Sequence, residues 1–534
     1  MTEGLAAGTT VDAVVVGSGP NGLVAANLLA DAGWDVLVLE SQPTYGGAVA
    51  SDREVHPDFV HDTFSSFHPL AVISPVIRSL DLERHGLRWA HAPSVVATPF
   101  RDGRWAELHR DRDRTAAGLD AFASGDGAAW LRLCAVWDRV GEEVVDALMS
   151  PFPPLRQGAR AVRRLPGPGA LRLLRAALGS GRGLADREFD GLAARVLVAG
   201  NAAHGDAAYG APGSGVFGLL LAMTAQQHGW PAPVGGAGSL ATALADRFTG
   251  AGGRIVCDAR VERVLVDQGR ATGVRVRGGG EVRVRRAVLA DVPAPTLYGG
   301  LVPWSDLPGR TRRLMRLFHW DPGTLKVDWA LSGPVPWAGR PSAAPGTVHV
   351  GETPEEIEQS QKELAAGAVP ARPFLLMGQM ATTDPTRAPA GQESAWAYTH
   401  VPQRVRSDAG DGGVRGTWDR DDAERMADRV QARVEAYAPG FSDRVLARRV
   451  LGPRELQERD ENLENGALNG GTGALRQQLV LRPVPGTGGA RTPVAGLYLA
   501  SSSAHPGGGV HGACGANAAH AALSSRRWPP RSRG

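Results

Sequence analysis

The chain has 534 residues, of which 43% are hydrophobic and 21% are charged, and its formal net charge is +3. A chain of this length is too long to fold around one compact hydrophobic core, so two domains are expected. The small net charge gives no support to a nucleic-acid partner. The three cysteines, Cys134, Cys257 and Cys514, form no C-x-x-C pair, which counts against a dithiol-disulfide reductase, a zinc ribbon and a disulfide scaffold.

The N-terminal region shows no secretory signal pattern, because its first apolar run, Val11 to Val16, leads directly into a glycine motif. No uninterrupted apolar run is long enough to span a bilayer. These patterns predict a cytoplasmic protein, with peripheral membrane contact left open.

Residues 11–40 are expected to form a strand, a tight turn, a helix and a second strand. Val11 to Val16 is a β-branched run, Leu23 to Ala32 has helical apolar spacing, and Val36 to Leu39 is a second apolar run. This succession predicts a βαβ unit.

The turn of this unit has the G-x-G-x-x-G spacing of dinucleotide-binding folds. Its residues are Gly17, Ser18, Gly19, Pro20, Asn21 and Gly22. The three glycines permit a tight turn, a close approach of the backbone to a pyrophosphate, and packing of the helix on the strand. Glu40, followed by Ser41, ends the second strand and is positioned to accept hydrogen bonds from ribose hydroxyls, which disfavours NADP. We predict that these residues bind a dinucleotide whose phosphates lie at the helix N-terminus.

Three further features favour FAD over NAD as that dinucleotide. Gly46-Gly47 extends the glycine-lined path beyond the ribose, a second nucleotide-domain segment returns at about 229–295, and a third glycine cluster follows residue 506. No second G-x-G-x-x-G follows a strand, so one dinucleotide site is expected.

Residues 76–228 are expected to be mainly helical, with a hairpin formed by Val95–Phe100 and Arg104–Leu108. Within them, residues 151–185 carry seven arginines and no acidic residue. Such a stretch is typical of a solvated basic face on a lid, and a surface for anionic lipid or an acidic partner is the less favoured interpretation.

The remaining elements are expected in two groups. A helix over Ser239–Phe248 and strands over 254–257, 261–266, 273–276 and 287–289 return to the nucleotide-binding domain, and a later helix covers Asp421–Tyr437. We therefore predict a discontinuous FAD-binding domain (1–75, 229–295 and 486–534) and a substrate or lid domain (76–228 and 296–485).

The C-terminal segment is expected to hold the flavin ring. A strand over residues 496–500 leads into a glycine-rich turn and a helix of small residues. The helix start near Val510 and His511, with Gly509 before it, would place N–H groups beside the flavin pyrimidine edge, where they stabilise the negative charge of reduced flavin.

These stretches, together with residues 61–69, resemble the phytoene desaturase-like branch of FAD-dependent oxidoreductases. The resemblance implies an α/β, two-domain flavoprotein with a Rossmann-like FAD domain and a mixed-sheet plus helical substrate domain. It implies noncovalent FAD, with Val261 holding the adenine through its backbone. It also implies oxidation or desaturation of a lipophilic, isoprenoid-like small molecule, with oxygen, a quinone or another carrier as electron acceptor. One departure is Ala48, where many relatives have arginine; a cation that contacts the phosphates is therefore either missing or supplied elsewhere, with Arg53 as the candidate.

Catalytic residues are sought among histidines near the two glycine segments. His511 lies in the flavin-facing turn, His505 just before it, and His68 where the chain enters the substrate cleft, and each is a candidate general base. Because His505 and His68 precede prolines, turn capping is the alternative role. Cys514 is expected to be a small buried thiol, with a covalent flavin link as the alternative.

Three rival functions stay open at this point. A flavin amine oxidase would share the cofactor domain but needs an aromatic pair to orient the amine. A prenyl-protein carrier shares the overall fold but lacks an intact phosphate motif, and a redox-neutral flavoenzyme would keep its flavin reduced.

Overall fold

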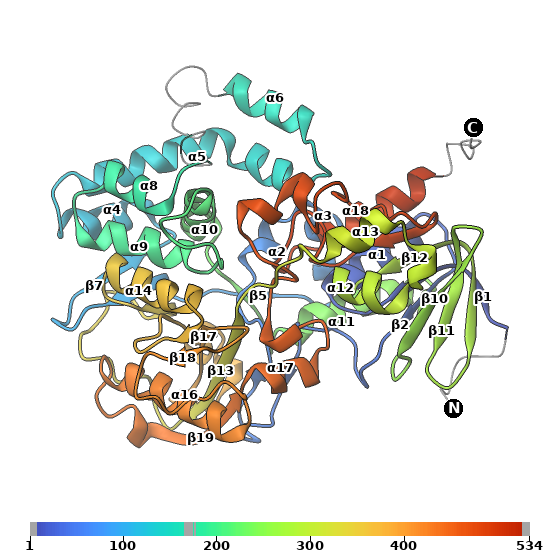
Figure 1. Ribbon diagram of the computed structural model, residues 1–534. Helices are drawn as coiled ribbons and strands as arrows, with labels where there is room; N and C mark the ends of the chain where they lie inside the picture. The colour runs from blue at the N-terminus through green and yellow to red at the C-terminus, as the bar shows by residue number, and fades with distance from the viewer. Residues whose placement is uncertain (1–7, 165–174, 176–177, 526–534) are drawn as a thin grey trace.

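The protein is represented by a computed structural model that describes residues 8–164, 175 and 178–525. Two large sheets lie on opposite sides of the molecule, and a group of helices covers one end of the second sheet (Figure 1). The N-terminal and C-terminal regions lie together on the side of the first sheet.

The first sheet has the strand order β10-β11-β12-β1-β2-β9, with β20 also pairing with β12. Its strands come from all three segments that the sequence groups as the FAD-binding domain. They are β1 (Thr10–Val16), β2 (Val36–Leu39), β9 (Arg254–Val256), β10 (Val261–Asp267), β11 (Arg270–Val276), β12 (Glu281–Ala290) and β20 (Leu497–Leu499). β1 pairs in parallel with β2 and β12, and β12 in parallel with β20. This parallel centre is buried, which accounts for its nearly continuous apolar runs.

Three helices belong to this side of the molecule: α1 (Pro20–Asp31), α11 (Gly238–Gly250) and α18 (Ala513–Ser524). α1 begins at Pro20, whose missing N–H and fixed φ suit a first helical position. α18 packs so closely on α1 that a Cβ at Gly515 would lie 1.9 Å from the Asn21 carbonyl oxygen. The C-terminal helix therefore lies directly against the predicted phosphate-binding helix.

The second sheet has the strand order β19-β13-β17-β16-β14-β6-β7. Its strands are β6 (Ser94–Pro99), β7 (Trp105–Leu108), β13 (Gly323–Leu331), β14 (Pro345–Val350), β16 (Leu375–Gln379), β17 (Glu393–Val401) and β19 (Val445–Leu451). One face carries Val327, Trp329 and Ala397, which share an apolar core with Met426 and Val430 of α16 (Arg420–Glu435). The opposite face, formed by the alternate residues, points to the interior of the molecule.

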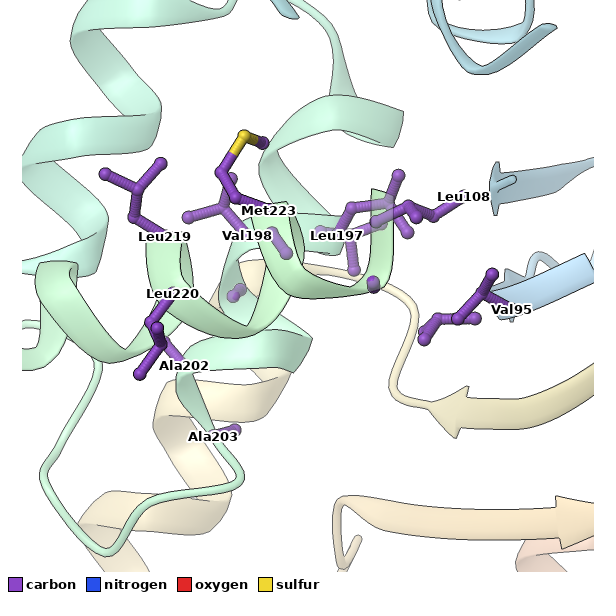
Figure 2. Close-up of a cluster of buried hydrophobic side chains, with 14 of the residues drawn as sticks. Val95, Leu108, Leu197, Val198, Ala202, Ala203, Leu219, Leu220 and Met223 are labelled. Atoms are coloured by element: carbon purple, nitrogen blue, oxygen red, sulfur yellow. The ribbon is translucent and has the colours of Figure 1, made fainter. Parts of the chain in front are cut away.

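The helical region contains α4 (Arg112–Asp120), α5 (Asp126–Met149), α6 (Leu155–Arg164), α8 (Gly181–Glu188), α9 (Leu192–Ala202) and α10 (Ser214–His228). Figure 2 shows part of its core, in which Leu197 and Val198 of α9 lie beside Leu219 and Met223 of α10. Val95 of β6 belongs to the same core, so the helices are anchored on the second sheet.

Shorter elements connect these parts. The paired strands are β3 (Ser51–Asp52) with β4 (His61–Asp62), β5 (Trp89–Ala90) with β8 (Ala232–Pro233), and β15 (Ala368–Val369) with β18 (Ser407–Asp408). The other helices are α2 (Pro69–Ile73), α3 (Pro75–Ser79), α12 (Ala294–Thr296), α13 (Gly309–Met315), α14 (Pro354–Ala365), α15 (Met380–Thr383) and α17 (Pro453–Arg459).

The structure differs from the sequence expectation at the last helix. α18 begins at Ala513, not near Val510–His511, because Gly512 adopts a left-handed conformation with φ of 68° and ends the preceding turn. Among the described residues, no helix is both long enough and apolar enough to cross a membrane.

The basic stretch 151–185 lies partly outside the described residues. Of its described arginines, Arg164 pairs with Glu143 at 2.9 Å, and Arg182 pairs with Glu355 at 3.1 Å and with Glu358 at 2.7 Å. Acidic partners from other segments therefore offset part of the charge of this stretch.

Candidate functional site

A cavity of about 400 Å³ lies between the two sheets and the helical region. Its lining includes Gly19 at the predicted phosphate turn, Gly509 in the C-terminal turn, Leu220 from α10 and Tyr398 from β17. This volume falls in the range of small-molecule sites. One continuous space thus joins the glycine-rich segments to side chains of the second sheet.

The phosphate turn has no room for side chains at its glycines. Gly17 has φ of 93°, and a Cβ at Gly19 would lie 2.9 Å from Asp291 Oδ2. A Cβ at Gly22 would lie 2.2 Å from the Gly17 carbonyl oxygen. Gly46 N–H donates to the Ser18 carbonyl at 3.1 Å, and a Cβ at Gly47 would approach the Gly19 Cα to 3.0 Å. The three glycines of the turn and the Gly46-Gly47 pair, which are separate in the sequence, therefore form one surface without side chains.

Glu40 lies at the end of β2, beside this surface, and is buried. Its Oε2 accepts hydrogen bonds from Ser18 N at 2.8 Å and Ser18 Oγ at 2.6 Å, and its Oε1 accepts one from Gln42 N at 2.9 Å. Ser41 Oγ approaches Oε1 at 3.3 Å, the longest of these contacts. A ribose hydroxyl would displace this serine hydroxyl first.

Val261, the residue that the resemblance places at the adenine, opens β10. Ala259 N–H, two residues earlier, donates to the Glu40 carbonyl at 2.7 Å. This bond brings the start of β10 next to the predicted ribose-binding acid.

Arg53, the candidate phosphate-contacting cation, does not lie at the phosphate turn. It is exposed, donates to the Pro57 carbonyl at 2.9 Å and is not part of the cavity lining.

Two buried carboxyl groups lie at the phosphate turn, and the sequence analysis missed both. Asp291 follows β12, lines the cavity and accepts a hydrogen bond from Gly22 N–H at 2.8 Å. Burial, reinforced by Asp460 and Glu40, raises the pKa of Asp291 to about 8 against the lowering effect of the Gly22 bond. Burial also raises the pKa of Asp460, another lining residue, to about 6.

His511 lines the cavity, but both of its ring nitrogens are engaged. Nδ1 accepts from Ala513 N–H at 3.0 Å, and Nε2 lies 3.2 Å from the Gly507 carbonyl. A neutral ring with its proton on Nε2 satisfies both contacts, and burial lowers the pKa of His511 to about 4. The geometry assigns His511 a capping role at the first turn of α18 and argues against proton transfer.

His68 and His505 occupy different surroundings. His68 lines the cavity, and its Nε2 lies 3.1 Å from Ser65 Oγ, which itself donates to the Ala48 carbonyl at 3.0 Å. Its Nδ1 has no partner among the described residues, and burial lowers its pKa to about 4. His505 is outside the cavity lining, with Nε2 at 3.1 Å from the Ser150 carbonyl at the end of α5.

Cys514 is buried in α18, and its Sγ lies 3.5 Å from the carbonyl oxygens of Ala504 and Gly507. Burial raises the pKa of this thiol to about 12. The group is therefore a neutral thiol, not a nucleophilic thiolate.

The second sheet supplies side chains that the sequence analysis did not select. Lys326 of β13 is buried in the cavity wall, donates to the Asp62 carbonyl at 2.7 Å and forms a close ion pair with Asp328. Asp328 is also bound by Arg449 at 2.9 Å. Burial lowers the pKa of Lys326 while Asp328 opposes that effect.

Aromatic rings of β17 continue this wall. Trp396 and Tyr398 are stacked, with centroids 6.0 Å apart and an interplanar angle of 18°, and Phe67 lies 6.1 Å from Trp396. Trp396 and Tyr398 are alternate residues of β17, so their rings lie side by side on one face of the sheet and do not oppose each other across the cavity. The missed pattern was visible in β13, where Thr324-Leu325-Lys326-Val327-Asp328 alternates polar and apolar residues and includes one of the two lysines of the chain.

The residues present fit a flavin dinucleotide. The bare glycine surface leaves space for a pyrophosphate at the N-terminus of α1, which has no side-chain cap. Glu40, at the end of β2, lies beside this space, and the same cavity continues past the C-terminal glycine turn.

Comparisons with known proteins agree with this arrangement. A family model described as an NAD(P)-binding Rossmann-like domain matches residues 15–80. The pyridine nucleotide-disulfide oxidoreductase domain-containing protein 2 of Rattus norvegicus is 31% identical over 95% of this chain and 92% of its own length. A neurosporene-forming phytoene desaturase of Rhodobacter capsulatus is 24% identical over 93% of this chain and 91% of its own. Putrescine oxidase bound to putrescine has a similar fold, with a TM-score of 0.59 at 16% identity, covering 97% of this chain and 99% of that one.

Proposed function

The chain belongs to the family of the rat pyridine nucleotide-disulfide oxidoreductase domain-containing protein 2, among the phytoene desaturase-like FAD-dependent oxidoreductases, and from this premise we propose its reaction. It binds FAD noncovalently and oxidises or desaturates C–H bonds of a lipophilic, isoprenoid-like small molecule. The observation that carries the proposal is the single cavity that joins the phosphate turn to a largely apolar pocket.

Noncovalent binding is supported by the cysteines. All three are free, and Cys134 and Cys514 are buried. The neutral Cys514 thiol is directed to backbone carbonyls, which leaves it unsuited to a covalent flavin link. The same cysteines offer no redox disulfide, in spite of the name of the rat relative.

The apolar part of the cavity supports a lipophilic substrate. Its lining includes Leu148 and Met149 at the end of α5, Phe217 and Leu221 of α10, and Phe67. Because the flavin ring must share a volume of about 400 Å³, a small or medium-sized substrate is favoured over a long carotenoid chain.

The protein's own residues position the reactants and exclude water. FAD, when bound, accepts a hydride at its N5 atom. The C-terminal turn is held by His511, and His68 is the predicted histidine that combines a place in the cavity with a nitrogen that has no partner among the residues described. We assign His68 as the candidate acceptor for the proton released with the hydride. Oxygen, a quinone or another carrier is the proposed electron acceptor, and peripheral membrane contact would give access to a lipophilic quinone.

An amine oxidase is the second candidate, since putrescine oxidase has a similar fold. The stacked, side-by-side arrangement of Trp396 and Tyr398 does not provide two rings that face each other around an amine. Asp206, a carboxyl group in the cavity lining, is engaged by Gly473 N–H at 2.5 Å and by the Thr472 hydroxyl. These contacts favour the C–H oxidation of a neutral lipophile.

Anaerobic reduction of the flavin tests this proposal. The FAD-loaded protein is mixed with a panel of isoprenoid alkenes and alcohols and a parallel panel of lipophilic amines, and the bleaching of the flavin absorbance is followed. We expect reduction by members of the neutral panel. Reduction by amines alone would establish the second candidate, and no reduction by either panel would contradict both.

A further inference from the structure

The cavity-facing side of the second sheet is polar although it is enclosed by protein. Strand register brings Lys326 beside Tyr398, Thr324 beside His400, and Thr347 beside Gly378, so these positions share one face. The polar side chains on that face include Thr324, Lys326, Asp328, Thr347, His349, Tyr398 and His400. The opposite face is the apolar core shared with α16.

Several polar atoms on this face have no partner among the described residues. They include Thr324 Oγ1, Thr347 Oγ1 and Trp396 Nε1, all buried in residues that line the cavity. A buried polar group without a hydrogen bond costs free energy. These atoms are themselves enclosed by protein, so they mark the wall as polar, and the contacts open to an occupant come from partly exposed side chains of the same face, such as Tyr398.

His204 lines the cavity and contacts His349 of the second sheet behind it. Their Nε2 atoms lie 2.8 Å apart, and burial lowers the pKa of His349 to about 3 and that of His204 well below its ordinary value. Both rings are thus neutral, and one Nε2–H donates to the other ring. His349 Nδ1 has no partner in the described ranges and faces Gly200, where a Cβ would lie only 2.3 Å away.

The tautomers follow from this packing. A proton on His349 Nδ1 would be a buried donor without an acceptor, which is the costlier arrangement, so the proton of His349 belongs on Nε2 and is donated to His204. The proton of His204 then lies on Nδ1. The His204 ring is partly exposed, lines the cavity, and makes no hydrogen bond within the described part of the chain other than the one to His349, so its Nδ1–H is a free donor.

Tyr398 supplies a hydroxyl group to the wall of the same cavity. It is half-buried, lines the cavity and lies 5.8 Å, ring to ring, from His400. Its hydroxyl has no hydrogen bond to any described residue, and burial raises its pKa, so it keeps its proton. His204 and Tyr398 are therefore neutral donors with no acceptor among the described residues.

We infer that the substrate carries a neutral oxygen, as a hydroxyl or carbonyl group, that binds in the cavity at His204 and Tyr398. This deepens the proposed function and rests on it. A carboxylate would find no free cation there, because Lys326 is paired with Asp328, and all three nitrogens of Arg482 donate to backbone carbonyls. An ammonium group would meet the N–H and O–H donors of His204 and Tyr398, and the Asp206 carboxyl group in the same lining already accepts from Gly473 N–H and the Thr472 hydroxyl.

The test compares three probes with the same fifteen-carbon isoprenoid chain: farnesene, farnesol and farnesylamine. Each is titrated anaerobically into the FAD-loaded protein, and the dissociation constant is read from the perturbation of the flavin spectrum. The variants are Tyr398→Phe and His204→Leu. Tyr437→Phe is the matched control, because Tyr437 is buried in the apolar core on the opposite face of the same sheet.

We expect farnesol to bind at least about tenfold more tightly than farnesene, and each cavity variant, but not the control, to remove most of that preference. Equal or tighter binding of farnesene or farnesylamine overturns the inference, as does a preference that survives both variants. A tenfold loss of FAD affinity in Tyr398→Phe would show that the polar wall serves the cofactor and would also overturn it. If none of the three probes perturbs the flavin, the proposed lipophilic substrate itself fails.

Discussion

The two walls of the cavity are built by different means. On the nucleotide side, the cofactor would meet main-chain atoms, because the residues there carry no side chains. Gly17, Gly19 and Gly22 form a surface on which a Cβ would not fit. On the second-sheet side, the groups that face the ligand are side chains, such as Lys326 and Tyr398, delivered by strand alternation. A backbone surface suits a common dinucleotide, whereas a side-chain surface can change with each substrate.

The largest effect is expected at the backbone wall. Gly19→Val would place a branched side chain where a Cβ alone already lies 2.9 Å from Asp291 Oδ2. We expect FAD affinity to fall at least about a thousandfold, equivalent to about 4 kcal/mol, as measured by flavin retention and titration. Gly118→Val is the control, because no atom lies within 4 Å of a Cβ at that position in α4. Retention of full flavin by Gly19→Val would remove the nucleotide assignment.

The next effect concerns the side-chain wall. Lys326→Met breaks a buried ion pair with Asp328, although Arg449 still binds that carboxylate. We expect the free energy of unfolding to fall by about 3 kcal/mol, which is at the lower end of the range for a broken buried ion pair. Urea denaturation measures this loss. The control is Lys362→Met, at the other lysine of the chain, which is exposed. This substitution should change the free energy of unfolding by less than about 0.5 kcal/mol. Equal effects of the two substitutions would mean that Lys326 is not a structural part of the wall.

A smaller effect depends on pH and involves the backbone wall again. Asp291, with a pKa of about 8, is protonated at neutral pH and becomes a carboxylate as the pH rises through 8. A carboxylate at the phosphate turn repels the pyrophosphate, so FAD affinity should be constant below about pH 7 and fall by up to about tenfold for each pH unit above 8.

Asp291→Asn isolates this titration. The amide keeps an oxygen for the Gly22 N–H bond but carries no charge, so its FAD affinity should not show the alkaline fall. A titration curve that is the same in both proteins would exclude Asp291 as the titrating group.

The smallest effect is expected at His511. His511→Ala removes the acceptor of Ala513 N–H at the start of α18, and the loss of such a cap costs about 1 kcal/mol. Flavin should stay bound, and its anaerobic reduction rate should change little. A drop of a hundredfold or more in that rate, with flavin retained, would restore His511 as a catalytic base.

The difference between the backbone wall and the side-chain wall also explains which features of the protein can be predicted from its sequence. Glycine spacing constrains the backbone directly, so the βαβ unit, the return of the chain to the first sheet and the bare surface at Gly46-Gly47 follow from the residues alone. Asp291 was missed because it meets Gly22 only through the pairing of β12 with β1, across 269 positions in sequence.

The substrate wall was missed for another reason. Its residues lie between 300 and 450, where the family resemblance is thin, and a lone histidine or tyrosine in a strand does not reveal which face will enclose a cavity. The alternation around Lys326 was the available indication. His511 was placed in the correct turn, but its role depends on the Gly512 conformation that delays α18, a detail that glycine-rich sequence does not specify.

The most direct test of the account is the visible absorption spectrum of the purified protein before and after denaturation. We predict the two bands of a bound flavin in the folded protein, and free FAD in solution once the chain is unfolded and removed. Flavin that remains on the unfolded chain would contradict noncovalent binding. A colourless protein that cannot be reconstituted with FAD would contradict the account itself.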